Sequence, residues 1–492
     1  MGQNGYHPST MERPSAAGDP AAASDPAEQV PGPRLEFYGG ALGALLPFGL
    51  FLVGVAWLGL SGAPDERGFW PVLLAALTLG LALAKDRHTW SETVVEGMSR
   101  PIVMIMVLAW LLAGVLGALM AASGFVEALV WVAEGVGVTG SGYTVAAFLI
   151  CCVVSTSTGT SLGTVILCAP LLYPAGGGLG ADPAWLIGAI LAGATFGDNV
   201  SPVSDTTIAS ALTQGADMRG VVRSRLRYAL PAAGLALVLY AIFGAGGGAE
   251  TVSEALVAGG SSADGLPMLL APLVVIVLLL RGRHLLHGLL VGIVVAVVVG
   301  LVLGLLAPSE VMYLDVEAFG AKGLIVDGLS RGLGVSVFTF LLMGLVACLE
   351  AAGVVDRLVA LAQGRATSLA AAERWMVAML STTALLTTHS TVAILTTGGF
   401  ARELGERFRV GAYRRANLLD CTACSWPHIF PWFVPAILTA STTASGADFG
   451  MPRVSTVEVG LSNLYSWALL AMVLAAITVG YGRTSKTAPD GV

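Results

Sequence analysis

The sequence contains few charged residues for its length. Asp, Glu, Lys and Arg make up only 12% of its 492 residues, whereas hydrophobic residues make up 55%. No polar stretch between the apolar segments is long enough to fold as a soluble domain of useful size. This composition excludes an ordinary soluble globular protein and is typical of a protein that crosses a membrane several times. We therefore expect membrane lipid around the protein and no nucleic acid as a partner.

Cysteine is also scarce, and its placement argues against disulfides. The six cysteines all lie in or beside apolar segments, at Cys151, Cys152, Cys168, Cys348, Cys421 and Cys424. We expect small buried thiols. The last two have the spacing of a C-x-x-C motif, but they follow Asp420 in an apolar segment without a surrounding redox fold. A redox or zinc role is therefore disfavoured.

The sequence lacks the signals of a secreted protein and of an enzyme. No charged segment followed by a short apolar run and a cleavage site is recognisable, so no signal peptide is predicted. Residues 1–38 are rich in Ala, Pro, Gly, Ser and acidic residues and indicate a disordered cytoplasmic tail. No nucleophile paired with a base and no metal-binding triad stands out, so we expect neither an enzyme nor a cofactor beyond the coupling ions of a transporter.

Apolar segments long enough to cross a hydrocarbon core of about 30 Å occupy most of the remaining chain. In the first half we expect spans at 39–60, 68–84, 100–122 and 226–245, an interfacial arm at 85–99, an interrupted segment at 141–174 and a broken helix at 183–213. In the second half we expect spans at 267–281, 284–306, 334–352 and 462–481, an arm at 316–332, an interrupted segment at 374–401 and a broken helix at 413–441. The same order of spans, arm, interrupted segment and broken helix recurs in both halves, which predicts an internal repeat.

The repeat divides the chain into two halves, at 39–245 and 266–482. A connecting loop at 246–265 joins them, and a short cytoplasmic tail follows at 483–492. Both interrupted segments fit either one broken span or a re-entrant hairpin, and the positions of Lys and Arg decide between these arrangements.

If both interrupted segments are hairpins, nearly all basic residues lie on the cytoplasmic side. Only four of the 25 fall outside, namely Arg67, Lys322, Arg331 and Arg453. Counting the first segment as a crossing would place the cluster from Arg219 to Arg227 outside, against the positive-inside rule. Each half then has five crossings, and an odd number inverts the second half. The predicted fold is an all-α polytopic protein of the cell membrane, with about ten transmembrane helices, two re-entrant hairpins, an inverted repeat and both termini in the cytoplasm.

Two carboxylates stand within a membrane-length apolar stretch. Asp198 and Asp205 lie in the run Gly-Asp-Asn-Val-Ser-Pro-Val-Ser-Asp-Thr-Thr. An ionisable side chain at the bilayer centre costs about 2.5–3.5 kcal/mol on insertion scales, so it usually faces a cavity or an ion. Pro202 can open a helix but cannot continue one, which predicts half-helices at 183–197 and 202–213. Broken helices of this kind form Na+ or H+ sites in secondary transporters.

The predicted break assigns a structural position to each polar residue of this run. Ser201 is expected to N-cap the second half-helix, with Ser204, Asp205 and Thr206 in its first turn beside the positive end of the helix dipole. Asp198 is expected in the unwound link. We therefore predict that these five residues bind a cation, Na+ in the first instance. The alternative is that both carboxylates only cap and turn a kinked helix, although one would suffice for a cap.

This run resembles the signature of the NhaC family of Na+/H+ antiporters, which reads G-D-x-x-S-P-x-S-D-T-T. The matching positions are Gly197, Asp198, Ser201, Pro202, Ser204, Asp205, Thr206 and Thr207. Asn199 and Val200 stand where many members carry Lys or His. The resemblance implies an antiporter of the ion-transporter superfamily, in which hairpins and broken helices slide as a transport domain against a scaffold, and a homodimer. The family also includes carboxylate exchangers coupled to Na+ or H+.

Hydroxyl-bearing residues gather at the tips of both hairpins. Non-helical backbone at membrane depth is tolerated where it is buried in protein or lines a cavity. The candidate ion or substrate ligands are Ser157, Thr158, Thr160 and Ser161 in the first tip, and Thr388, His389, Ser390 and Thr391 in the second. The structural alternative is that Ser and Thr hydroxyls bond back to helical carbonyl groups.

The second broken helix adds a third carboxylate. Asp420 is predicted to bind an ion, or alternatively to pair with Arg414 or Arg415 at the cytoplasmic end. His389 and His428 are candidates for pH sensing because histidine titrates near physiological pH. Each is equally well explained as a polar residue of the core.

Two functions fit these features. The first is cation/proton antiport, in which Asp198 and Asp205 alternately bind Na+ and H+. No Lys or Arg falls in either hairpin tip or either helix break, which favours a cation over an anion. The second is Na+- or H+-coupled transport of a small organic solute, a carboxylate or an amino acid, held by hydroxyls and half-helix N-termini. A channel or a membrane sensor is a third class, but the 38-residue tail is too small for a sensor domain.

Overall fold

The computed structural model describes residues 35–60, 66–245, 262–316, 320–354, 357–358, 362 and 365–483. The described chain is mostly helical and forms an all-α polytopic membrane fold, as predicted. Eight of its helices are long and apolar enough to cross a membrane, or up to nine if a pair bent by 56° counts as one span. Most of the predicted N-terminal tail and connecting loop, and residues 484–492, lie outside the described residues.

The elements of the first half follow the predicted order. They are α1 (Ala41–Leu60), η1 (Glu66–Phe69), α2 (Trp70–Leu83), α3 (Arg87–Met98), α4 (Pro101–Ala122), α5 (Phe125–Gly135), α6 (Ser141–Thr158), α7 (Ser161–Gly178), α8 (Pro183–Val200), α9 (Asp205–Gln214) and α10 (Met218–Phe243).

The second half contains a similar series and one short sheet. Its elements are η2 (Leu266–Leu269), α12 (Leu270–Leu280), α13 (Leu285–Val302), α14 (Pro308–Val311), β1 (Tyr313–Asp315), β2 (Gly320–Lys322), α15 (Leu324–Ala351), α17 (Leu369–Thr387), α18 (Ser390–Arg407), α19 (Ala412–Ala423), η3 (Trp426–His428), α20 (Val434–Thr442), η4 (Thr443–Phe449), α21 (Thr456–Ser462) and α22 (Leu464–Thr478). The strands β1 and β2 pair antiparallel, with Leu314 opposite Ala321.

The segment predicted as an arm at 85–99 is the helix α3. Asp86 caps its N-terminus by accepting a hydrogen bond from the backbone N–H of His88 at 2.9 Å. The helix buries Trp90 and Val94, and its face packs against α15. This packing explains the helical spacing of its apolar residues, which a solvated helix would not need.

Two parts of the fold differ from the prediction. The arm expected at 316–332 does not exist as a unit, because most of its described residues are divided between the strand β2, at Gly320–Lys322, and the helix α15, from Leu324 onward. The predicted arm ended at residue 332 and the next predicted span began at residue 334. Nothing between them stops a helix, so α15 runs without a break for 28 residues. The helix α5 was not predicted at all. It starts after Gly124, whose φ of 76° turns the chain out of α4, and it buries Phe125 and Val126.

The long helices α4 and α15 pack very closely, and glycine makes this possible. A Cβ atom on Gly114 would lie 2.1 Å from the carbonyl oxygen of Gly328, and one on Gly328 would lie 2.4 Å from the Cα of Val115. Further along, a Cβ on Gly332 would lie 2.9 Å from the carbonyl oxygen of Trp110. Small residues at helix crossings are the usual means of close packing in membranes.

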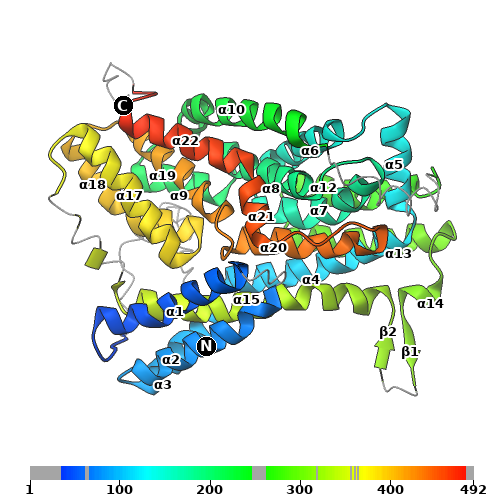
Figure 1. Cartoon of the computed structure of the whole chain (residues 1–492), viewed down its shortest axis with the longest axis horizontal. Coiled ribbons are helices and arrows are strands. Elements are labelled where there is room, and N and C mark those ends of the chain that lie inside the picture. Colours follow the sequence, from blue (N-terminus) through cyan, green and yellow to red (C-terminus); the bar gives the residue numbers. More distant parts are fainter. Residues whose placement is uncertain are drawn as a thin grey trace, which may run out of the picture.

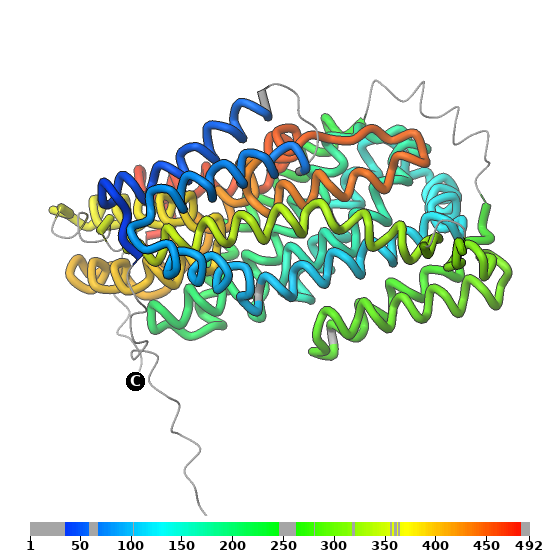
Figure 2. The backbone as a smooth tube through the Cα atoms, turned by 90° about the horizontal axis from the view of Figure 1, so that it is seen from below, coloured from blue at the N-terminus to red at the C-terminus, as the bar shows by residue number. Residues whose placement is uncertain are grey.

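The other helices pack in separate groups around the α4–α15 pair. Figure 1 shows α1, α2, α3 and α15 along one side of the molecule, with α10 and α22 along the opposite side. The pair α1 and α2 packs against α15, whereas the pair α12 and α13 packs against α4. Figure 2 shows the α12–α13 pair, in green, at the edge of the molecule. The hairpins and broken helices α6 to α9 and α17 to α20 pack among themselves and with α10 and α22.

The glycine contact predicts a clear stability difference. We expect Gly328→Ala to destabilise the protein by about 1–3 kcal/mol, because the new methyl group overlaps the α4 backbone. Gly49→Ala in α1 is the matched control, since a methyl group there would meet no atom within 4 Å and Ala favours a helix. The measurement is thermal unfolding of both variants in detergent, and equal melting temperatures would contradict the close crossing.

Candidate functional site

The first broken helix consists of α8 and α9, separated by residues 201–204. The break lies later than predicted, because α8 continues through Asp198 to Val200. The residue before a proline is driven out of the helical region, and Ser201 before Pro202 is extended, with φ −72° and ψ 131°. Ser201 therefore ends α8 and is not the N-cap of the second half-helix. That position is taken by Ser204.

Asp198 lies in the last turn of α8 and not in the unwound link. Its side chain is buried, with 7% of the residue exposed. One carboxylate oxygen accepts a hydrogen bond from the Ser161 hydroxyl of the first hairpin tip. The other accepts from the Ser204 hydroxyl across the break, at 3.3 Å. The structure thus brings together a tip residue, a break residue and the buried carboxylate, as the sequence suggested.

The link also folds back on the end of α8. The hydroxyl groups of Thr206 and Thr207 both donate to the backbone carbonyl oxygen of Asp198 at 3.3 Å. The Ser204 and Thr206 hydroxyls lie 3.0 Å apart. Because a helix leaves its last carbonyl groups without helical partners, these hydroxyls compensate for the break and concentrate oxygen atoms around Asp198.

Asp205 has a different environment. It is the first residue of α9, as predicted, but its side chain is exposed. The Thr391 hydroxyl of the second hairpin tip donates to its Oδ2 at 2.6 Å. The backbone N–H of Thr206 donates to its Oδ1 at 2.9 Å. The two predicted carboxylates are therefore unequal, since one is buried and the other is accessible.

Both interrupted segments are helical hairpins. In the first, the backbone N–H of Gly140 donates to the carbonyl oxygen of Leu179 at 2.5 Å, so the chain leaves the hairpin where it entered. Its tip turns at Gly159, with a φ of 70°. The second hairpin turns at Thr388, a non-glycine residue with a φ of 54°. This backbone conformation is unfavourable for threonine.

The hydroxyls of the first tip do not act as a group. Ser157 bonds back to the carbonyl oxygen of Val153 at 2.7 Å, and Thr160 caps α7 by accepting from the N–H of Gly163 at 3.2 Å. Thr158 lies 3.4 Å from the Thr164 hydroxyl. Among the hydrogen bonds of the described residues, only Ser161 of this tip reaches Asp198. The back-bonding alternative thus accounts for Ser157, whereas Ser161 contacts Asp198 and stays a candidate ion ligand.

The second tip contacts both broken helices. Ser390 donates to the carbonyl oxygen of Ala423, at the end of α19, at 2.9 Å. Thr391 reaches Asp205 as described. Two buried polar atoms at this tip, Thr388 Oγ1 and His389 Nδ1, have no hydrogen-bond partner among the described residues. Orphaned buried polar atoms are uncommon and often mark a place for water, an ion or a ligand.

The second broken helix comprises α19, η3 and α20, with an irregular link at 424–433. His428 in η3 is buried, and its Nε2 lies 3.5 Å from the Ser161 hydroxyl. Its Nδ1 has no partner among the described residues. The contacts Ser161–Asp198, Ser161–His428, Thr391–Asp205 and Ser390–Ala423 therefore join each hairpin tip to both helix breaks.

Asp420 is paired with a residue that was not predicted from the sequence. Its carboxylate lies 2.9 Å from the guanidinium of Arg225 in α10, and both side chains are fully buried. Asn199 and the Ser210 hydroxyl also donate to Asp420, at 2.9 and 3.2 Å. The predicted partners Arg414 and Arg415 were wrong: Arg414 pairs with Glu373 at 3.0 Å, and Arg415 bonds to Gln214 at 2.9 Å.

Arg225 connects the two broken helices. Its guanidinium donates to the carbonyl oxygen of Asn199 at 2.8 Å and to the Thr207 hydroxyl at 2.7 Å, on either side of the first break. Its Nε donates to Asn417 of α19 at 3.2 Å. A cation therefore does lie at the helix break, although none is near it in sequence. The sequence feature that could have revealed Arg225 is its spacing of four residues from Val221 and from Ala229. This spacing places the three side chains on one face of a helix, and they form a buried stripe of α10. The predicted span began at 226, whereas α10 begins at Met218.

The side chains that contact Asp198 offer hard oxygen atoms. Within the described residues, no group of three or more His, Cys, Asp or Glu side chains could hold a metal ion. The ligands at hand are the carboxylate of Asp198 and the hydroxyls of Ser161, Ser204 and Thr206. Hard oxygen ligands suit alkali and alkaline-earth cations. The six cysteines are all buried and free, as predicted.

Comparison with known proteins agrees with this arrangement. Residues 48–245, which contain the first hairpin and the first break, match the model of the Na+/H+ antiporter family. The chain is 30% identical over 213 residues to the Na+/H+ antiporter NhaC of Alkalihalophilus pseudofirmus, covering 42% of this chain and 46% of the relative. It is 27% identical over 220 residues to NhaC of Bacillus subtilis, covering 43% and 48%. These matches confirm the predicted relationship to the NhaC family.

Another relative of this chain has a different name. The chain is 29% identical over 181 residues to the malate-2H+/Na+-lactate antiporter of Bacillus subtilis, covering 37% of this chain and 38% of the relative. The chain thus spans less than half the length of the curated relatives it matches. Together with the apolar helices, these similarities support a multi-pass membrane protein that resembles the NhaC antiporters.

The buried pair predicts a strong dependence on both charges. We expect Arg225→Gln to destabilise the protein by about 3–5 kcal/mol, because it leaves the Asp420 carboxylate buried without its counterion. The double variant Arg225→Gln/Asp420→Asn should recover much of this loss. Arg223→Gln, on the exposed face of the same helix, should have little effect. The measurement is thermal unfolding in detergent, and similar behaviour of the Arg225 and Arg223 variants would contradict this account.

Proposed function

We propose that the protein is a secondary active Na+/H+ antiporter of the cell membrane, in which the Asp198 carboxylate binds Na+ and H+ in alternation. The observation that carries the proposal is the environment of this buried carboxylate. Among the hydrogen bonds and ion pairs of the described residues, its side-chain partners are the hydroxyls of Ser161 and Ser204 and not a cationic group. A buried carboxylate without a fixed counterion has a strong need for a bound cation or a proton.

The chemistry of exchange follows from this need. A single carboxylate surrounded by hydroxyl and carbonyl oxygens can hold Na+ or be neutralised by a proton, but one state excludes the other. Asp205 is exposed and accepts a hydrogen bond from Thr391 of the second hairpin tip. It is therefore suited to transfer a cation between the solvent and Asp198. Ser201, Ser204 and Thr206 would complete the oxygen shell. Asp420 is already neutralised by Arg225, which assigns it to the support of the site.

The arrangement of helices suggests how alternating access could arise. We propose that the two halves, at 39–245 and 266–482, form an inverted repeat. The hairpins and broken helices would then move as an elevator-type transport domain against a scaffold built on α4 and α15. In support, the first hairpin and break, α6 to α9, are followed by the span α10, and the same order recurs in α17 to α20 and α22. A homodimer with both termini in the cytoplasm completes the proposal.

A second function has one specific observation in its favour. One relative is named as an antiporter of malate and lactate. The orphaned atoms of Thr388 and His389 at the second tip could hydrogen-bond a small carboxylate or amino acid. Na+- or H+-coupled transport of such a solute would use the same ion site. His389 and His428 stay candidates for pH gating under either function.

The first experiment follows proton flux in proteoliposomes with a trapped pH-sensitive dye. We expect added Na+ to drive proton movement in the wild-type protein, and Asp198→Asn and Asp205→Asn to abolish it while still folding. Asp264→Asn, an exposed carboxylate outside the site, should retain the flux. Undiminished flux in Asp198→Asn would refute the ion-site assignment. Silence of the folded wild-type protein with Na+, Li+ and K+ would instead favour the solute function.

The two serines of the first tip provide a finer test. Ser161→Ala removes a hydrogen bond to the charged carboxylate, whose typical value is about 1.5–3 kcal/mol, so the half-saturating Na+ concentration should rise by about 10-fold or more. Ser157→Ala, in the same tip, removes only a bond to the carbonyl oxygen of Val153 and should leave it unchanged. The measurement is Na+-dependent proton flux. Equal shifts in both variants would remove Ser161 from the site.

A further inference from the structure

Arg331 occupies a costly position within a long apolar helix. From the sequence we expected it in an arm outside the membrane, which was wrong, because Arg331 lies within α15. Its neighbour Gly332 packs against Trp110 and Leu111, and Gly328 packs against Gly114 and Val115. These contacts place Arg331 level with the middle of α4, which runs from Pro101 to Ala122. An arginine at this depth usually faces a cavity and has a function.

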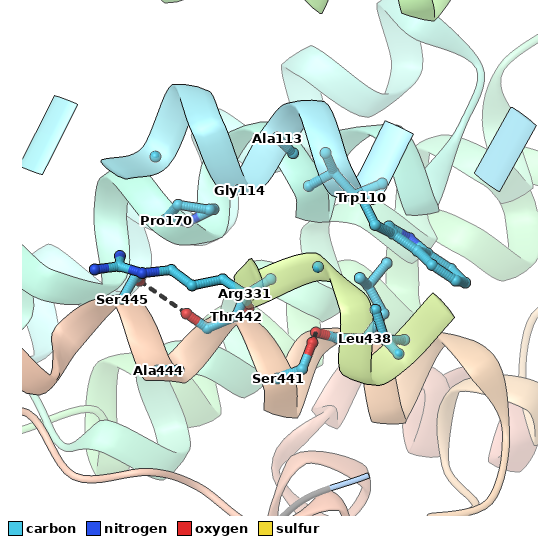
Figure 3. A pocket seen from close by; sticks show the side chains of 14 residues that line it. Trp110, Ala113, Gly114, Pro170, Arg331, Leu438, Ser441, Thr442, Ala444 and Ser445 are labelled. Carbon is cyan, nitrogen blue, oxygen red and sulfur yellow. Dashed lines mark hydrogen bonds between the residues drawn. The ribbon is translucent and has the colours of Figure 1, made fainter. Parts of the chain in front are cut away.

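A cavity of about 60 Å³ lies beside Arg331, between the α4–α15 pair and the helices α7, α20 and η4. Much of its wall is apolar, with side chains such as Ala113, Ile166, Pro170, Val335 and Leu438. Figure 3 shows the Arg331 side chain extending to one end, beside Ser445, with the Trp110 indole at the opposite end. The cavity therefore combines an apolar wall with one cationic group.

The free hydrogen-bond donors of this cavity are the Trp110 indole and the Arg331 guanidinium. The hydroxyls of Ser441, Thr442 and Ser445 already donate to the backbone carbonyl oxygens three residues earlier, at 2.6–2.8 Å, and so have no free donor. The Trp110 side chain is buried, and its Nε1–H has no acceptor among the described residues. The Arg331 guanidinium can donate several hydrogen bonds and accept none. Such a site favours a ligand that accepts hydrogen bonds and carries negative charge.

The ion pair that the structure gives Arg331 is a weak one. Asp448 of η4 lies 3.5 Å from its guanidinium, and the side chains of Arg331 and Asp448 are 35% and 70% exposed. At 3.5 Å this contact is longer than a charge-assisted hydrogen bond, so it holds the guanidinium only loosely. A carboxylate entering the cavity could displace Asp448 and form two parallel bonds with the planar guanidinium.

We propose that this cavity is a binding site for a small organic carboxylate with an apolar body. The carboxylate would pair with Arg331 and the body would lie against the apolar wall. The site is separate from the hydroxyl-lined Asp198 site, and the proposal does not depend on ion exchange there. Because its walls come from both the α4–α15 pair and the hairpin-containing helices, an occupied cavity would also restrain movement between them.

Benzoate is a suitable probe, since it joins a carboxylate to a flat apolar ring. We expect saturable benzoate binding to the purified full-length protein, measured by isothermal titration calorimetry in detergent. Benzamide, which has the same ring without the charge, should not bind measurably. Arg331→Gln should weaken benzoate binding by about 10-fold or more, whereas Arg331→Lys should keep part of the affinity. Asp448→Asn should tighten binding, because it removes the competing carboxylate.

Two further variants serve as controls. Arg283→Gln removes an exposed positive charge from the turn between α12 and α13 and should leave benzoate binding unchanged. Asp198→Asn should bind benzoate like the wild-type protein, which separates this proposal from the proposed ion exchange. Absence of benzoate binding to the folded wild-type protein, or equal affinity in Arg331→Gln, would overturn the proposal.

Discussion

The contact between Ser161 and Asp198 is the interaction on which the site depends. It joins the tip of the first hairpin to the end of the first half-helix, and through His428 it reaches the second broken helix. The second tip makes the reciprocal contacts, to Asp205 and to the end of α19. A carboxylate at membrane depth is tolerated only where polar groups hydrogen-bond to it. The need to satisfy Asp198 therefore explains why two hairpins and two breaks converge on one place.

Arg225 shows how the same fold neutralises a second buried carboxylate beside the first break, Asp420. The guanidinium binds Asp420 and also the backbone and hydroxyl groups on both sides of the first break. One carboxylate thus has a permanent counterion, and the other has only hydroxyl donors. On our proposal, this difference separates a structural ion pair from a site that binds an exchangeable cation. Asn199, where many NhaC members carry Lys or His, contributes to the pair by donating to Asp420.

The sequence predicted those features that depend on local chemistry. Pro202 marked the first break, the hydroxyl-rich tips marked the hairpins, and the signature around Asp198 indicated a resemblance to the NhaC family. Features that depend on tertiary contacts were missed. Arg225 and Arg331 both lie within long helices whose starts were predicted too late, so Arg225 was assigned to a cytoplasmic loop and Arg331 to an arm. Ser157 and Ser161 are alike in sequence, and only packing separates a backbone contact from a contact with Asp198.

The central claim is that Na+ and H+ compete for the Asp198 carboxylate. The most direct test adds Na+ to purified protein in weakly buffered detergent solution and records proton release with a pH indicator. The account predicts release that saturates with Na+ in the wild-type protein and is absent from Asp198→Asn. Saturable Na+ binding without proton release, or undiminished release in the variant, would contradict it.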